Sequence, residues 1–280
     1  MLVTSSEMLN KAREGGYAVG AFNVENMEMV QSAIEAAEEL NAPILLQTTP
    51  STVKYAGLDL YYSMVATQAA KAKVPVALHL DHGSSFALCA QALRAGYTSI
   101  MIDGSKLPLE ENIALTRKVV EMCEPAGIPV EGEIGRVGGK EDDTECEEAG
   151  YTIPEEAVRF ERETGLSSMA VGVGTAHGVY KTKPVLNTHL IQQLRGMLTV
   201  PMVLHGASGL SDEAIRECIH NGICKVNFAT ELRIAYTKGV REVLTDSSVF
   251  DPKAFGRVGR ERVREAVKYR ILTCGCDGKA

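Results

Sequence analysis

Eight short apolar segments rich in β-branched residues recur along the chain, and each is followed by a longer stretch with helical spacing. The predicted strands cover residues 18–24, 43–49, 75–81, 98–104, 128–135, 168–174, 200–206 and 224–230. Eight strands that alternate with helices over roughly 250 residues have the size and order of a (β/α)8 TIM barrel. A doubly wound open sheet is the structural alternative, because counting strands does not separate the two architectures.

The predicted helices carry recognisable faces and ends. The helix predicted at 27–41 places four apolar residues on one face: Val30, Ala33, Ile34 and Ala37. The helix predicted at 211–222 has Ser211 as its N-cap, acidic residues in its first turn and Gly222 at its end. We therefore expect α/β architecture throughout.

No linker or low-complexity run divides the chain, so we expect a single domain over residues 1–280 that ends in a helical extension. The segment "GRVGGKEDDTECEEAGYT" at 135–152 is glycine-rich, then acidic, and longer than a typical strand-to-helix connection. It is either a solvated surface loop or a mobile lid over an active site.

Composition limits the kinds of partner. A net charge of −7 argues against a broad surface for nucleic-acid phosphates, but a small anionic molecule needs only a local positive pocket. No apolar run approaches the roughly 20 residues of a membrane span, and the first residues do not resemble a secretory signal. Seven scattered cysteines, an odd number, are typical of a reducing compartment. We expect a cytoplasmic protein without nucleic-acid or membrane partners.

Polar residues stand at or near the carboxyl end of every predicted strand. In a (β/α)8 barrel these ends converge on one rim, where catalytic residues lie. The residues concerned are Asn23, Thr48, Thr49, Asp81, His82, Asp103, Glu131, Glu133, His177, His205, Asn227 and Thr230.

Three histidines, His82, His177 and His205, come from three different strand ends. Three neutral imidazoles suit a tetrahedral zinc ion with one open position. Of the other histidines, we expect His79 to hydrogen bond inside the barrel and His189 and His220 to lie on surface helices.

Glycine and hydroxyl residues follow the last three strands, in "GTAHGVYK", "HGASGLS" and "NFAT". Loops at this position of the barrel often bind phosphate, and Lys181 would add positive charge there. The alternative is ordinary turn chemistry, because glycine and serine are common in any turn.

Six motifs together resemble the class II, zinc-dependent ketose-bisphosphate aldolases over nearly the whole chain. They are "HLDHGSS", "MIDGS", "EGEIGRVGGKEDD", "GTAHGVYKTKP", "LHGASGL" and "KVNFATELR". Thr49 and the sequences "TAHG", "HGASGL" and "ATEL" are most similar to the tagatose-1,6-bisphosphate branch. Gly83 departs from that branch, where many sequences have a second histidine after His82, and "LDHGSSF" is similar to some fructose-1,6-bisphosphate aldolases.

The resemblance implies Asp81 as the catalytic acid and base, and Glu141 as a mobile carboxylate that moves a proton at the nucleophilic carbon. The implied zinc ligands are His82, His177 and His205, with Asp103 and Glu133 beside the metal. The implied pocket for dihydroxyacetone phosphate comprises Asn23, Thr49, Gly178, Lys181, Gly206, Ala207, Ser208, Asn227, Phe228, Ala229 and Thr230. A Na⁺ or K⁺ ion beside the phosphate, a homodimer or homotetramer, and a non-catalytic companion subunit are further expectations.

Several alternatives stay open. The substrate is a tagatose or a fructose 1,6-bisphosphate, or a related ketose 1-phosphate with another anion at C6. Candidates to bind that anion are Arg257, Arg260, Arg262 and Arg264, unless they only form a solvated helix face. Rival functions are a Schiff-base aldolase, a zinc hydrolase and a non-catalytic partner subunit. Lys225, the lysine nearest the rim on a strand, is expected to be structural.

Overall fold

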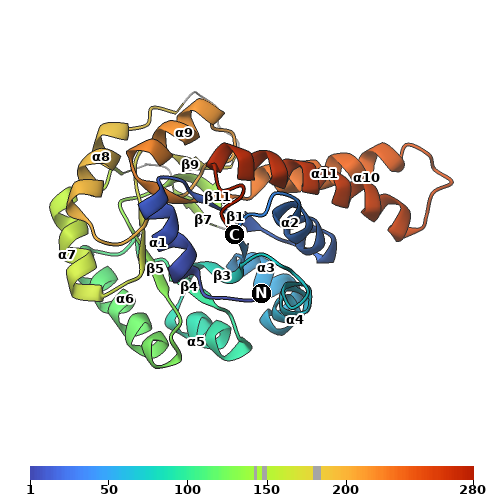
Figure 1. The fold of residues 1–280 in the computed structure, drawn as a ribbon. Helices are drawn as coiled ribbons and strands as arrows, with labels where there is room; N and C mark the ends of the chain where they lie inside the picture. Colours follow the sequence, from blue (N-terminus) through green and yellow to red (C-terminus); the bar gives the residue numbers. More distant parts are fainter. Residues whose placement is uncertain (142–143, 147–149, 179–183) are drawn as a thin grey trace.

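A computed structural model describes residues 1–141, 144–146, 150–178 and 184–280; the side chains of 140–141 and 144–146 lie outside the description (Figure 1). The strands are β1 (Val19–Asn23), β2 (Ile44–Thr48), β3 (Val76–Gly83), β4 (Ser99–Ile102), β5 (Val130–Ile134), β6 (Gly138–Glu141), β7 (Thr144–Cys146), β8 (Ser168–Val171), β9 (Ala176–His177), β10 (Met202–Leu204) and β11 (Ile223–Phe228). The helices are α1 (Ser5–Gly15), α2 (Met27–Glu39), α3 (Pro50–Ala56), α4 (Leu58–Ala69), α5 (Phe86–Ala95), α6 (Leu109–Cys123), α7 (Pro154–Thr164), α8 (Thr188–Met197), α9 (Asp212–Asn221), α10 (Thr230–Val243) and α11 (Pro252–Cys274), with a 3₁₀ turn at Glu124–Ala126.

Eight parallel strands close into a barrel in the order β1-β11-β10-β8-β5-β4-β3-β2. Each of the eight predicted segments supplies one of these strands, and the observed bounds differ from the predicted ones by a few residues at most. Closure between β1 and β11 excludes the open-sheet alternative. The fold is therefore the predicted (β/α)8 barrel.

Helix starts and faces follow the sequence pattern. Ser211 caps α9 by accepting a hydrogen bond from the backbone N–H of Ala214, as predicted. The predicted apolar face of α2 is buried against the barrel. Within the described ranges, none of the helices combines the length and apolarity that a membrane crossing would need.

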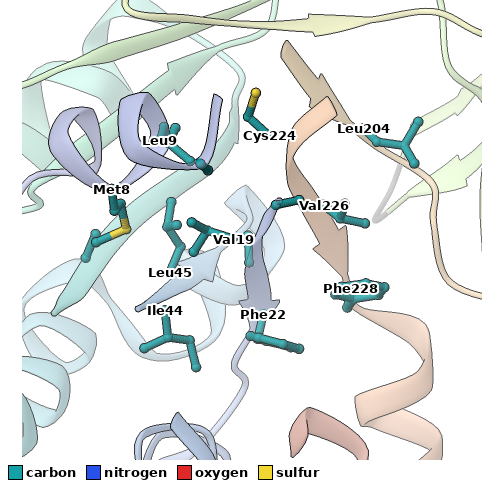
Figure 2. Close-up of a cluster of buried hydrophobic side chains, with 14 of the residues drawn as sticks. Met8, Leu9, Val19, Phe22, Ile44, Leu45, Leu204, Cys224, Val226 and Phe228 are labelled. Atoms are coloured by element: carbon teal, nitrogen blue, oxygen red, sulfur yellow. The ribbon is translucent and has the colours of Figure 1, made fainter. Parts of the chain in front are cut away.

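Helix α1 lies at the amino end of the barrel. Its Met8 and Leu9 belong to the same buried cluster as Val19, Ile44 and Cys224, which stand at or near the starts of their strands (Figure 2). The amino end is thereby filled with apolar side chains. The polar site residues lie at the opposite, carboxyl end of the strands, as in other barrels of this type.

The segment 135–152 contains regular structure that the sequence analysis did not predict. β6 pairs antiparallel with β7 and parallel with β9, so that Gly139 stands opposite His177. A small second sheet thus lies beside the end of the barrel that carries His177. The choice between a surface loop and a mobile lid for this segment stays open, and strands β6, β7 and β9 are additions to what the sequence predicted.

Helices α10 and α11 form a long pair that projects from the barrel, and α2 packs against α11 (Figure 1). Three of the arginines proposed for a C6 anion lie on α11 and already contact side chains of α2 or α10. Arg260 donates to Gln31 and contacts Glu35, Arg262 contacts Glu242, and Arg264 lies 3.5 Å from Glu39.

Candidate active site

The carboxyl ends of the barrel strands bring the predicted polar residues together. Asp81 and His82 stand at the end of β3, Asp103 directly follows β4, and Glu133 lies near the end of β5. His205 directly follows β10. His177 comes from β9 rather than from a barrel strand, and its place beside the barrel depends on pairing with β6.

The rings of His82, His177 and His205 lie close together, edge-on or tilted to one another. Their ring centroids are 4.6 Å apart for His82 and His205, 5.2 Å for His82 and His177, and 6.2 Å for His177 and His205. One nitrogen from each ring lies within 4.8 Å of the others, so the three can hold a single metal ion. Three imidazoles at this spacing fit zinc.

A second group within the described residues also fits a metal ion, namely His82, Asp103 and Glu133. His82 Nδ1 lies 2.9 Å from Asp103 Oδ2, so a proton on Nδ1 is donated to that carboxylate. Burial alone would raise the pKa of Asp103, but the His82 ring and the Ser105 N–H and O–H groups hold it below its usual range. Asp103 thus orients His82 and leaves its other nitrogen to face the site.

The backbone at the end of β3 is unusual, and it explains how two consecutive residues serve one site. Neighbouring strand residues normally point to opposite faces. His82 has a φ of +49°, a left-handed conformation that is uncommon for residues other than glycine, and the β3–β4 register shifts between Leu80 and Gly83. His82 Nε2 consequently lies only 4.0 Å from Asp81 Oδ1.

Gly83 is required by close packing at the same place. A Cβ atom at Gly83 would lie 2.3 Å from the backbone carbonyl oxygen of Met101 and 2.9 Å from Cys89 Sγ. The Gly83 carbonyl also accepts the N–H of Asp103 at 3.0 Å. The residue therefore allows β3 and β4 to approach where both deliver site residues.

Asp81 is fully buried inside a set of three side-chain amides. Its Oδ2 accepts from Asn23 Nδ2 at 2.9 Å and from Gln47 Nε2 at 3.1 Å, and its Oδ1 accepts from Asn227 Nδ2 at 3.1 Å. The sequence analysis missed Gln47, which lies inside β2 and also donates to Asn23 Oδ1 at 2.8 Å. A polar residue in the middle of a predicted strand was the available signal.

His205 contacts two acids. Its Nδ1 lies 3.0 Å from Glu133 Oε2 and its Nε2 lies 3.2 Å from Glu131 Oε1. Burial alone would lower the pKa of His205, but these hydrogen bonds outweigh burial and raise it to about 9. His79, predicted to hydrogen bond inside the barrel, does so through Nδ1 and Ser99 Oγ at 2.7 Å.

A cavity opens where β9, β10 and β11 end, and its lining contains most of the predicted phosphate-binding residues. The residues that line it are Asn23, His177, Gly178, Gly206, Ala207, Ser208, Asn227, Ala229, Thr230 and Arg233. Gly206 has a φ of +65°, and a Cβ atom there would lie 2.6 Å from the Ala176 carbonyl oxygen. Ser208 Oγ accepts the Ala229 N–H at 3.2 Å, which ties two of the loops together.

Two predicted residues stand apart from this lining, and one unpredicted residue joins it. The Phe228 side chain is buried and stacks on Phe22 with a centroid distance of 5.5 Å. Thr49 Oγ1 lies 3.1 Å from Thr52 Oγ1, which donates to Glu25 at 2.8 Å. Arg233, which the sequence analysis missed, donates to Glu25 at 2.7 Å and borders the cavity.

Two predicted residues lie wholly or partly outside the description. Lys181 is outside the described residues, and only the backbone of Glu141 is described, as the last residue of β6. Glu141 follows Gly139, which pairs with His177, by two positions. The strand that carries Glu141 therefore runs beside the residue expected to bind the metal.

Known proteins match the chain over its whole length. The family described as fructose-bisphosphate aldolase class-II matches residues 3–279. The structure of the YdjI aldolase from Escherichia coli K12 is 37% identical with a TM-score of 0.91, and the match covers 100% of both chains. A putative fructose-1,6-biphosphate aldolase from Coccidioides immitis is 31% identical with a TM-score of 0.90, covering 98% of this chain and 96% of that one. A fructose-bisphosphate aldolase from Campylobacter jejuni, 22% identical with a TM-score of 0.84, shares the fold over 100% of this chain and 97% of its own.

Proposed function

Because the chain belongs to the class II fructose-bisphosphate aldolase family, and is therefore a carbon–carbon lyase, we propose that it reversibly cleaves a ketose 1,6-bisphosphate with the aid of zinc. The products would be dihydroxyacetone phosphate and glyceraldehyde 3-phosphate. The observation that carries the proposal is the convergence of His82, His177 and His205 beside the buried carboxylate of Asp81.

The proposed zinc ligands are the three histidines, with Asp103 and Glu133 close by. When bound, zinc would supply Lewis-acid stabilisation of the negative charge that builds up on the ketose carbonyl oxygen as the C3–C4 bond breaks. The orienting contact between Asp103 and His82 supports this assignment, because metal-binding histidines usually donate their second N–H to a carboxylate.

Asp81 is proposed to take the proton from the C4 hydroxyl during cleavage and to return it during condensation. Its carboxylate is 0% exposed and accepts three amide hydrogen bonds, which fix its position without neutralising it. A carboxylate held in place in this way can accept the proton of a bound substrate hydroxyl without first changing its own conformation.

The remaining proposed roles concern the phosphate and the second proton. The backbone of the glycine- and serine-containing loops around Gly178, Gly206 and Ser208 would bind the C1 phosphate, and Lys181 would add charge. Glu141 is proposed to move the proton at C3, and the pairing of its strand with β9 supports its approach to the metal residues.

A lysine Schiff base, the rival way to stabilise the same charge, is disfavoured at Lys225. Lys225 is 0% exposed, and its Nζ lies 3.0 Å from both oxygens of Glu131 inside the barrel. A substrate carbonyl would have to displace this ion pair to reach the amine. A companion subunit without catalytic function is disfavoured because Asp81 and the three histidines are present together.

Tagatose 1,6-bisphosphate is the proposed sugar, supported by Thr49 and by the "TAHG", "HGASGL" and "ATEL" sequences. Fructose 1,6-bisphosphate is the second candidate, and Gly83 is the residue that favours it. A related ketose 1-phosphate with another anion at C6 is the third candidate. The acidic partners of Arg260, Arg262 and Arg264 in this chain disfavour these arginines as the site for either C6 anion.

One experiment tests both the reaction and the sugar. Release of triose phosphate is measured from ketose phosphates that differ at C4 and at C6, with and without a zinc chelator. We expect cleavage that the chelator abolishes and that zinc restores, with the highest kcat/KM for the tagatose compound. Full activity in a metal-free preparation would refute the proposed mechanism, and preference for fructose would correct the sugar alone.

We further propose that the chain forms a homodimer or homotetramer. The projecting α10–α11 pair supports this, since it carries exposed apolar residues such as Ile234, Leu244 and Phe250 on or between its helices. Light scattering of the purified protein measures the mass directly.

A further inference from the structure

A charged pair is buried inside the barrel, below the proposed metal site. Lys225 on β11 reaches across to Glu131 on β5, and its Nζ lies 3.0 Å from each carboxylate oxygen. The side chains are 0% and 1% exposed. β11 and β5 are not neighbours in the barrel, because β10 and β8 lie between them, so the pair crosses the interior.

Stability alone does not explain such a pair. Barrel interiors of this fold are usually filled with layers of branched apolar side chains. A buried ion pair loses its hydration on folding, and replacing one with apolar residues of similar volume is often neutral or stabilising. We therefore look for a role of the Lys225–Glu131 pair other than stability.

The contacts of Glu131 indicate what that role is. Besides Lys225, it accepts from Ser168 Oγ at 3.2 Å, and its Oε1 lies 3.2 Å from His205 Nε2. Lys225 Nζ also lies 3.4 Å from His79 Nε2. Lys225, Ser168 and His79 come from three different strands and His205 directly follows a fourth, so the position of the Glu131 carboxylate is fixed from several sides.

His205 presents its other nitrogen toward the rim. Nδ1 lies 3.0 Å from Glu133, a member of the second group that could hold a metal, whereas Nε2 faces Glu131 and the ion pair below. A metal ion bound at Nδ1 would take the place of the hydrogen bond to Glu133, while the Nε2–H donated to Glu131 would stay and hold the ring in one orientation.

We propose that Lys225 and Glu131 are positioning residues: the ammonium of Lys225 holds Glu131 as a fixed acceptor for the Nε2–H of His205, so that Nδ1 is the nitrogen presented to the metal. The inference rests on the proposed metal site. Asp103 performs the corresponding function for His82 from the other side of the site. Lys225 therefore serves the reaction without touching the substrate.

The test compares zinc affinity in three variants and one control. Glu131→Gln keeps the side-chain volume and removes the charge, Lys225→Met removes the ammonium, and the third variant combines both. Arg270→Met is the control, because it breaks the ion pairs that a buried arginine makes with the partly exposed Glu231 and Asp212, among α9, α10 and α11. Zinc dissociation constants are measured by competition with a chromophoric chelator, and folding is followed by circular dichroism.

We expect Glu131→Gln and Lys225→Met each to weaken zinc binding by about 10- to 100-fold, the usual effect of removing a partner of a metal-binding histidine. The double variant should be no weaker than the worse single variant, because both changes break one unit. Arg270→Met should lower the unfolding temperature but leave the zinc dissociation constant unchanged. The visible spectrum of the cobalt-substituted protein should shift in the Glu131 and Lys225 variants and not in the control.

The outcomes separate the two levels of the proposal. Wild-type zinc affinity and an unchanged cobalt spectrum in folded Glu131→Gln overturn the positioning role and leave the proposed function intact. A wild-type protein that binds no zinc overturns the proposed metal site and the positioning role together. If Lys225→Met fails to fold, Glu131→Gln decides the matter by itself, since it preserves the volume of the side chain.

Discussion

Truncating Asp81 should separate catalysis from metal binding. Asp81→Ala removes the proposed proton acceptor for the C4 hydroxyl, and general acid–base catalysis is typically worth about 10²- to 10⁴-fold. The corresponding rise in the activation free energy is about 2.7–5.4 kcal/mol, because each tenfold change in rate is about 1.36 kcal/mol. Zinc binding should stay close to that of the wild type, because Asp81 belongs to neither group of residues that could hold the metal.

The three amides around Asp81 supply the matched control. Gln47→Leu removes one donor and leaves the carboxylate in place, held by Asn23 and Asn227. A hydrogen bond to a charged group contributes about 1.5–3 kcal/mol, and Gln47 divides its N–H groups between Asp81 and Asn23. We therefore expect kcat/KM of Gln47→Leu to fall by about tenfold, which corresponds to the lower end of that free-energy range.

The assay is steady-state release of triose phosphate, accompanied by zinc content, binding of a dihydroxyacetone-phosphate analogue and thermal unfolding. Asp81→Ala also leaves three buried donors without an acceptor, so a lower unfolding temperature is expected unless water replaces the carboxylate. Loss of zinc together with loss of rate would show that Asp81 is structural. Equal rates in Asp81→Ala and Gln47→Leu would show that the amides, not the carboxylate, limit catalysis.

Three further outcomes are expected. The purified protein should contain one zinc ion per chain, and removal of that ion should abolish cleavage until zinc is restored, as elemental analysis and assay will show; activity without metal contradicts this. Glu141→Ala should slow exchange of the C3 proton of dihydroxyacetone phosphate with solvent deuterium in the absence of aldehyde, and exchange at the wild-type rate would assign that proton to another base. Ser211→Ala should lower the free energy of unfolding by about 1 kcal/mol through loss of the α9 cap, with kcat/KM unchanged.

The barrel could be predicted from the sequence because its signal is local. Each strand appears as an apolar run, and the carboxyl end of each run carries polar residues that the fold then gathers. The order of elements was sufficient to place Asp81, His82 and His205 on one rim. The resemblance of the motifs supplied their proposed roles.

The features that were missed depend on contacts between distant parts of the chain. β6 and β9 pair across 38 positions, as between Gly139 and His177, and neither strand has the apolar alternation that reveals a strand. The Lys225–Glu131 pair joins residues 94 positions apart. No periodicity within either strand indicates that contact, because each residue is interpretable only once the barrel is closed.

The close packing at Gly83 has a consequence for how this site can change over generations. A histidine there would place its Cβ 2.3 Å from the Met101 carbonyl oxygen, so the substitution would disturb the β3–β4 pairing before it altered any chemistry. Any larger residue at position 83 of this chain would therefore require the β4 backbone to move as well. The glycine of "LDHG" thus has a packing requirement of its own, which is separate from any part that this position takes in the choice of sugar.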